Sequence, residues 1–163
     1  HAHSFGLEVG IVPTEDAKVV ETWTDLKRVH SRVCCLVDGD AEGFRYSAEL
    51  AQAGASPGSI IRWPDGQMLE DILFWIFSAD PVSIAVIARD IPALVNADVP
   101  MVVAYAKAKK CDLVLYEAIA EAVVDNEICR GRASELFESL ALACADLESA
   151  RFSWAENAWV FQP

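Results

Sequence analysis

Residues 32–50, RVCCLVDGDAEGFRYSAEL, join a short apolar run to two aspartates and then to a segment with helical spacing. The run RVCCLV (32–37) is continuous and bounded by polar residues, which is typical of a strand buried inside a parallel sheet. The next segment, 41–54, places apolar residues at helical spacing and ends at a glycine. A strand, a polar turn and a helix are therefore expected in succession, with Asp38 and Asp40 in the turn.

The same alternation continues on both sides of this stretch. Towards the N-terminus, GLEVGIVP (6–13) is predicted to be a strand and residues 14–29 a helix. Towards the C-terminus, SIIRW (59–63) is predicted to be another strand and residues 69–77 a mostly buried helix. Alternating strands and helices indicate an α/β fold, in which a parallel sheet carries crossover helices.

The second half of the chain has a different pattern. Prolines interrupt it, and two segments, 111–124 and 132–150, have apolar stripes at helical spacing. No segment there shows the pattern of a strand. The sequence therefore predicts an α/β domain over residues 1–78 and a helical extension packed on it over residues 79–163.

The composition limits the class of protein. The chain has 163 residues, 53% of them hydrophobic, which is enough for one sizeable core. The longest nearly uncharged run, residues 72–88, contains Asp80 and Pro81 and falls short of the roughly 20 apolar residues that cross a bilayer. No signal-peptide pattern opens the chain. We therefore expect a cytoplasmic protein without a membrane span.

Charge and cysteine content limit the class further. The chain has 25 acidic and 13 basic residues and a net charge of −12, which repels nucleic acid at long range, so any contact with DNA has to be local. The five cysteines include no Cys-x-x-Cys pair, and an odd number cannot all pair within one chain. We expect reduced thiols, with neither a zinc site nor a disulfide framework.

The turn Asp38-Gly39-Asp40 is the candidate functional site. Open parallel sheets bind ligands beyond the carboxyl ends of their strands, and two carboxylates one residue apart can converge on one hard cation. A magnesium ion bound there would serve phosphoryl or phosphodiester chemistry. The simplest alternative is a polar turn whose acids cap the next helix.

A calcium-binding loop is a second alternative. The EF-hand pattern is nearly met at its positions 1, 3, 5, 6 and 12 by Asp38, Asp40, Glu42, Gly43 and Glu49. Two features oppose this interpretation. An EF-hand needs a helix before the loop, where RVCCLV favours a strand, and position 8, normally apolar, is Arg45.

The stretch LVDGDAEG (36–43) resembles the Asp-x-Asp-x-x-Gly motif of Toprim domains. These domains are the metal-binding fold shared by topoisomerases, primases and the OLD (overcoming lysogenisation defect) nucleases. Two further segments, DGQMLED (65–71) and KKCDLVLYEAIAEAV (109–123), are similar to the region after the motif in OLD-type ATP-dependent endonucleases. The resemblance covers residues 6–78 well and the helical half by pattern only.

The resemblance implies an endonuclease that uses Mg²⁺ or Mn²⁺ to hydrolyse DNA phosphodiester bonds by a two-metal mechanism. It makes Asp38 and Asp40 metal ligands and Glu70 the candidate ligand of the second metal. Lys110 would stabilise charge that develops on the phosphate. The family's glutamate should precede residue 32, where no apolar strand followed by Glu-Gly occurs, so the Toprim-like sheet is expected to lack its first strand.

The resemblance also implies partners, namely DNA, an ATPase domain of the same parent protein and a second copy in a full-length homodimer. Three other functions stay open: a non-catalytic Toprim-like regulatory or assembly domain, a phosphohydrolase with an aspartate nucleophile, and the calcium-binding module. Simpler roles also stay open for two residues. Glu70 could be an acid at a helix start and Lys110 a solvent-exposed lysine.

Overall fold

The computed structural model describes residues 10–14, 18–110 and 112–163. The chain divides into two compact units. The sheet unit comprises His1–Met68 together with Leu136–Pro163, and the helical unit comprises Leu69–Glu135. In chain order, the helical unit is therefore an insertion into the sheet unit.

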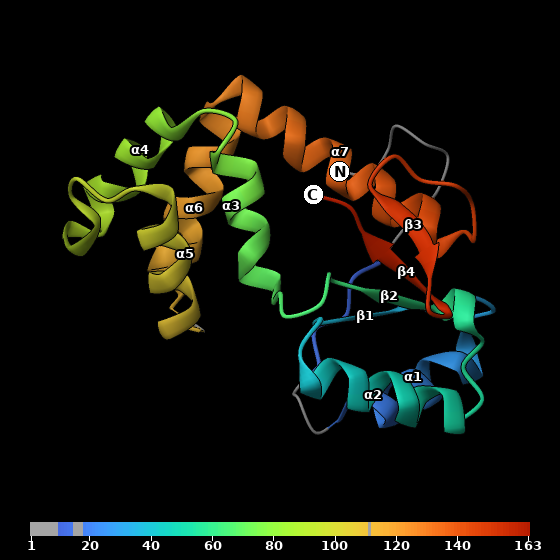
Figure 1. Ribbon diagram of the computed structural model, residues 1–163. Helices are drawn as coiled ribbons and strands as arrows, with labels where there is room; N and C mark the ends of the chain where they lie inside the picture. Colours follow the sequence, from blue (N-terminus) through green and yellow to red (C-terminus); the bar gives the residue numbers. More distant parts are fainter. Residues whose placement is uncertain (1–9, 15–17, 111) are drawn as a thin grey trace. The chain divides into compact units, whose positions relative to one another are not determined.

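The sheet unit is built on four strands in the order β1-β2-β4-β3. Strand β2 is parallel to both β1 and β4, whereas β3 is antiparallel to β4. The mixed α/β class predicted from the sequence is confirmed, and a mostly parallel open sheet is consistent with a Toprim-like domain. The elements of this unit, shown in Figure 1, are α1 (Val19–Val29), β1 (Cys35–Val37), α2 (Ala41–Gln52), β2 (Ile60–Arg62), the end of α7 (Glu127–Cys144), β3 (Phe152–Ala155) and β4 (Ala158–Phe161).

Strands β3 and β4 correct the prediction that the second half lacks strands and forms a helical extension over residues 79–163. The two strands form a hairpin whose connecting residues, Glu156 and Asn157, have φ angles of 50° and 63°. Positive φ at both positions of a two-residue loop matches the twist of paired strands. The sheet unit therefore takes in the C-terminal residues, and the helical region is confined to Leu69–Glu135.

Strand β1 is shorter and more exposed than the buried strand predicted over residues 32–37. Among the described strands it pairs with β2 alone, so it lies at an edge of the sheet, and the Leu36 side chain is 43% exposed. The strand predicted over residues 6–13 lies outside the described residues as far as residue 9. Residues 10–13 form no strand.

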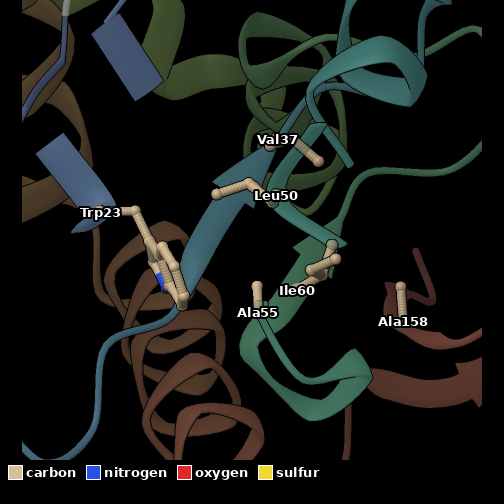
Figure 2. Packing of buried hydrophobic residues seen from close by; sticks show 6 residues of the cluster. All are labelled: Trp23, Val37, Leu50, Ala55, Ile60 and Ala158. Atoms are coloured by element: carbon tan, nitrogen blue, oxygen red, sulfur yellow. The ribbon is translucent and has the colours of Figure 1, made fainter. Parts of the chain in front are cut away.

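A hydrophobic core holds the sheet unit together. Helices α1 and α2 cover one face of the sheet (Figure 1) and contact each other. Helix α2 begins at its N-cap residue, Asp40, and ends before Gly54, whose φ of 96° favours glycine. The buried core residues, drawn as sticks in Figure 2, are Trp23, Val37, Leu50, Ala55, Ile60 and Ala158.

Most of the short helices in the helical unit have a proline in the first turn or an aspartate at the N-cap. Pro81, Pro92 and Pro100 occupy the first turns of their helices, where a missing backbone N–H costs little. Helix α4 packs on α6, and α3 packs on α5. The helices are α3 (Ile72–Phe77), α4 (Ile84–Asp90), α5 (Val99–Ala108), α6 (Leu113–Asp125) and the first part of α7.

No single helix in the described ranges is long and apolar enough to cross a membrane. The segments Leu69–Phe77 and Pro81–Asp90 meet the criteria of length and composition only as a pair, and they are bent by 114°.

Candidate functional site

The acidic turn Asp38-Gly39-Asp40 follows β1 directly, at the carboxyl end of a parallel strand. Asp38 and Asp40 are both partly buried. Oδ1 of Asp40 accepts a hydrogen bond from the backbone N–H of Gly43 at 2.9 Å and so caps α2. Its other oxygen, Oδ2, has no hydrogen-bond donor within the part of the chain that the structure describes. The turn therefore holds Asp40 by one oxygen and leaves the second available.

Gly39 fastens the acidic turn to the loop that follows β2. Its backbone N–H donates to the carbonyl of Gln67 at 2.7 Å, and its own carbonyl accepts from the N–H of Gly66 at 2.8 Å. A Cβ added at Gly39 would lie 1.8 Å from the Pro64 carbonyl oxygen, a distance that no side chain tolerates. The position therefore requires glycine.

The second glycine of the motif is equally constrained. A Cβ added at Gly43 would lie 1.9 Å from the carbonyl oxygen of Asp38. The first turn of α2 thus packs directly on the backbone of the acidic turn. The motif Asp-Gly-Asp-x-x-Gly is a compact unit in which both glycines have a steric role.

Arg62, at the end of β2, is a residue whose role sequence reasoning missed. It is 3% exposed, and its guanidinium donates to Asp65 Oδ1 at 2.5 Å and to Glu156 Oε2 at 2.8 Å. The guanidinium carbon lies 4.1 Å from the centre of the Phe44 ring. The signal was an arginine inside an otherwise apolar strand, SIIRW. Its contacts join β2, α2 and the β3–β4 turn.

Glu70 and Lys110 lie together in the helical unit. The Glu70 side chain is 9% exposed, and its Oε1 lies 3.9 Å from Nζ of the half-exposed Lys110. Oε2 of Glu70 is buried without a hydrogen-bond partner. The neighbouring Asp71 pairs with Lys107 at 2.7 Å. A buried carboxylate oxygen without a donor is costly, so Glu70 is the acid of this unit that a cation would stabilise most.

The predicted metal ligands Asp38, Asp40 and Glu70 come from two different units of the chain. In residues 10–14, 18–110 and 112–163, no three His, Cys, Asp or Glu side chains come close enough to hold a metal ion. The two aspartates belong to the sheet unit, and Glu70 and Lys110 belong to the helical unit.

Carboxylates such as those of Asp38 and Asp40 are a ligand type that magnesium takes. Magnesium is commonly bound by one or two carboxylates, with water and substrate phosphate filling the other positions of its octahedron. Asp38 and Asp40 follow β1 at the edge where parallel sheets bind ligands, and Oδ1 of Asp40 is the oxygen that caps α2.

The structure excludes the EF-hand interpretation of the same stretch. Residues 41–52, which would form most of a calcium loop, are the helix α2. The side chains of Glu42 and Glu49, at loop positions 5 and 12, both pair with Arg45 on the surface of that helix. A calcium loop would need these two acids to turn towards a common ion.

Several basic side chains that could contact DNA have partners inside the chain. Lys27 donates to the carbonyl of Ser31, Arg28 pairs with Asp25, and Arg32 donates to the carbonyl of Ala145. Such pairs reduce the charge available to phosphates.

Comparison with protein-family models, with curated proteins and with solved structures finds no match to this chain. The class of the protein is therefore defined by its fold and its candidate site alone. The protein is a mixed α/β domain whose mostly parallel sheet carries a tightly packed acidic turn at the carboxyl end of β1.

Proposed function

We propose that this chain is the Toprim-like part of an OLD-type ATP-dependent endonuclease, which hydrolyses DNA phosphodiester bonds with Mg²⁺ or Mn²⁺. The observation that carries the proposal is the acidic turn at the end of β1. It presents two carboxylates at the ligand-binding edge of a parallel sheet, in a shape that Gly39 and Gly43 hold in place.

In this proposal Asp38 and Oδ2 of Asp40 hold the first ion. A bound magnesium or manganese ion supplies charge neutralisation for the phosphate and a more acidic water. The hydrogen bond from Gly43 to Oδ1 fixes the Asp40 carboxylate before any ligand arrives. The N-terminus of α2, directly behind the turn, adds a positive partial charge that favours a phosphate.

Glu70 is the proposed ligand of a second ion, and Lys110 is the proposed cation for charge that develops on the phosphate. The buried, unpartnered Oε2 of Glu70 supports the first role. Its neighbour Lys110 supports the second, because it is half exposed and only loosely paired at 3.9 Å.

Partners and location follow from the same proposal. The acidic chain would meet DNA as part of a larger assembly, with an ATPase domain of the parent protein and a second copy supplying basic surface. The proposed location is the cytoplasm. The family resemblance of residues 36–43 supports these partners.

A non-catalytic Toprim-like regulatory or assembly domain is the second candidate. One observation favours it: no third acidic, histidine or cysteine side chain joins Asp38 and Asp40 in the described ranges. In that case the acids would serve as the cap and the polar turn of α2.

Calorimetric titration of this chain with Mg²⁺, Mn²⁺ and Ca²⁺ tests the proposal. Asp38→Asn and Asp40→Asn should each weaken Mn²⁺ binding at least about tenfold, because each removes one charged ligand. Asparagine still caps a helix, so Asp40→Asn separates metal binding from capping. The matched control is Asp98→Asn, since Asp98 caps α5 with the same 2.9 Å hydrogen bond, to Met101, and should leave binding unchanged.

The titration also separates the two candidates. If the chain binds Mn²⁺ and both Asp38→Asn and Asp40→Asn abolish the binding, the nuclease is supported. The parent protein should then lose DNA cleavage when it carries either substitution. A chain that binds none of the three ions supports the non-catalytic domain. Metal binding that survives in Asp38→Asn and Asp40→Asn would contradict the assignment of these ligands.

A further inference from the structure

Two cysteines far apart in the sequence meet in the sheet unit. Cys34 precedes β1, and Cys144 is the last residue of α7. The Cys34 thiol donates a hydrogen bond to the backbone carbonyl oxygen of Cys144 at 3.4 Å, across 110 positions of sequence. Both are reduced and partly buried. Cys34 lies at the opposite end of β1 from the acidic turn, and the proposed nuclease does not need the pair.

The surroundings give the two thiols different acidities. The hydrogen bond from Cys34 lowers the pKa of Cys144, and the charge of Arg32 lowers it further, against the effects of burial and of Cys35. The pKa of Cys34 is raised by its hydrogen bond with Cys144 and by burial, and Asp146 raises it as well. Cys144 is therefore the sulfur that ionises first, while Cys34 keeps its proton.

Arg32 also offsets an unfavourable electrostatic effect on the ionisation of Cys144. Cys144 lies at the C-terminus of α7, where unpaired carbonyl groups disfavour a thiolate. The Arg32 guanidinium donates to one of the carbonyls there, that of Ala145, at 2.8 Å. The positive charge is thus placed where it offsets the helix end.

The thiol pair faces a cavity that can admit a small molecule. The cavity has a volume of about 460 Å³ and is lined by Cys34, Cys144, Arg32, Asp146, Trp154 and Trp159, among others. This volume lies within the range of small-molecule sites. Arg32 offers a partner for a carboxylate on such a molecule, and the indole rings offer an apolar wall.

We propose that Cys34 and Cys144 form a dithiol–disulfide pair that is oxidised by a small carboxylate-bearing disulfide of the glutathione type. Cys144 is the attacking sulfur and Cys34 the resolving one. The geometry carries the proposal: the Cys34 thiol reaches the backbone of Cys144, and both cysteines line a cavity together with Arg32.

Oxidation of the two cysteines takes two thiol–disulfide exchange steps. The Cys144 thiolate attacks one sulfur of the small disulfide, whose S–S bond breaks, so that a mixed disulfide forms and one small thiolate leaves. Cys34 then gives its proton to the first small thiolate and attacks the Cys144 sulfur, so that the mixed disulfide breaks and the second small thiolate leaves. That thiolate takes up the proton that Cys144 released to water when it ionised. Two protein thiols are oxidised, and one small disulfide is reduced to two thiols.

Peptide mapping of the oxidised chain tests the pair. The starting protein is Cys35→Ala, so that the tryptic peptide 33–45 carries Cys34 alone. After treatment with oxidised glutathione and acid quenching, peptide 33–45 should be linked to peptide 133–151, with a mass lower by two hydrogen atoms than the reduced pair. In Cys34→Ser the reaction should stop at a glutathione adduct on Cys144. Circular dichroism confirms that each variant is folded.

A rate comparison tests which sulfur attacks. Serine at position 34 keeps a hydrogen-bond donor to Cys144, whereas alanine removes it. Cys34→Ala should therefore form the Cys144 adduct more slowly than Cys34→Ser at neutral pH. We expect a rate about threefold lower for each unit by which the pKa of Cys144 rises. The thiolate fraction of Cys144 falls about tenfold per unit, but the remaining thiolate is a stronger nucleophile and offsets part of that loss. Cys129, which is buried, should stay unmodified in both variants.

Three results would overturn the proposal. They are the absence of a link between Cys34 and Cys144, an adduct that forms first on Cys34, and equal rates for Cys34→Ser and Cys34→Ala.

Discussion

Gly39 lies so close to Pro64 that a Cβ at position 39 would be 1.8 Å from the Pro64 carbonyl oxygen. This contact joins the loop that carries the two aspartates to the loop after the neighbouring strand β2. Backbone hydrogen bonds between Gly39 and the residues Gly66 and Gln67 secure the same junction. The position of the acidic turn thus depends on a second loop as well as on its own sequence.

Replacing this glycine should destabilise the sheet unit. We expect Gly39→Ala to lower the free energy of unfolding by about 2–4 kcal/mol, because backbone rather than a flexible side chain has to move. The control is Gly131→Ala in α7, where nothing lies within 4 Å of the added Cβ. It should raise stability by about 0.5–1 kcal/mol, the usual gain for alanine in a helix. Urea unfolding measures both, and a Gly39→Ala protein as stable as the control would contradict the contact.

Arg62 should not be replaceable by lysine. A lysine lacks the planar fork that reaches Asp65 and Glu156 at once while lying over the Phe44 ring. Because both acids are largely exposed and solvent screens them, we expect Arg62→Lys to cost about 1–2 kcal/mol of unfolding free energy.

The control for Arg62 is Arg45→Lys. Arg45 also bridges two carboxylates, but it is half exposed on the surface of α2. Its replacement should change the unfolding free energy by less than about 0.5 kcal/mol in the same urea experiment. If the two substitutions lowered the unfolding free energy equally, the burial of Arg62 would make no contribution to stability.

The pair of Glu70 and Lys110 should add little to stability. At 3.9 Å, with the lysine half exposed, a double-mutant cycle of Glu70→Gln and Lys110→Met should give a coupling energy of about 0.5 kcal/mol. The pair of Asp71 and Lys107, which is closer at 2.7 Å and has a less exposed lysine, should give a larger coupling energy, about 1 kcal/mol. A coupling above about 2 kcal/mol for Glu70 and Lys110 would mark the pair as structural and weaken its proposed role at a metal.

Cys35 should make stability fall at alkaline pH. Burial, with a smaller effect of Cys34, raises the pKa of the Cys35 thiol to about 12 in the folded protein. Since an unfolded thiol loses its proton near pH 8.5, the stabilisation is complete below that pH and is lost as pH rises towards 12.

Comparison with Cys35→Ala isolates the Cys35 contribution. Between pH 8.5 and 10 the wild-type chain should lose about 2 kcal/mol of unfolding free energy more than the variant does. Urea unfolding at several pH values gives the two slopes, and parallel slopes would refute the raised pKa.

Local signals in the sequence predicted the first half of the sheet unit well. Helix α2 and strand β2 follow from apolar spacing and from turn residues next to them. The prediction that β1 is a buried central strand was wrong because its position in the sheet depends on a distant segment of the chain. A continuous apolar run does not reveal whether a strand is central or at an edge, and the edge position of β1 depends on β4 pairing with the other side of β2.

The hairpin of β3 and β4 was missed although it left a signal. Two aromatic-rich runs, FSWA and AWVF, flank the dipeptide Glu156-Asn157, and asparagine is favoured where φ is positive. Trp159 is buried, but Trp154 is half exposed and packs edge-on against it at 5.5 Å.

Some residues of the candidate site could be predicted from local sequence and others could not. Asp38 and Asp40 could be placed from one contiguous motif. The contacts of Arg62 with Glu156 and of Cys34 with Cys144 span 94 and 110 positions, so no local pattern reveals them. Glu70 and Lys110 were each selected from the sequence, but their proximity depends on how the helices pack within the helical unit.

The place of β4 between β2 and β3 has a consequence for biosynthesis. On the ribosome, β1 and β2 emerge early, whereas the strand that pairs with the open side of β2 is made only after the whole helical insertion. Until then β2 has an unpaired edge, which can pair with another nascent chain. Chains released before residue 158 should therefore aggregate or be degraded, so that quality control favours molecules in which the last strand has been translated.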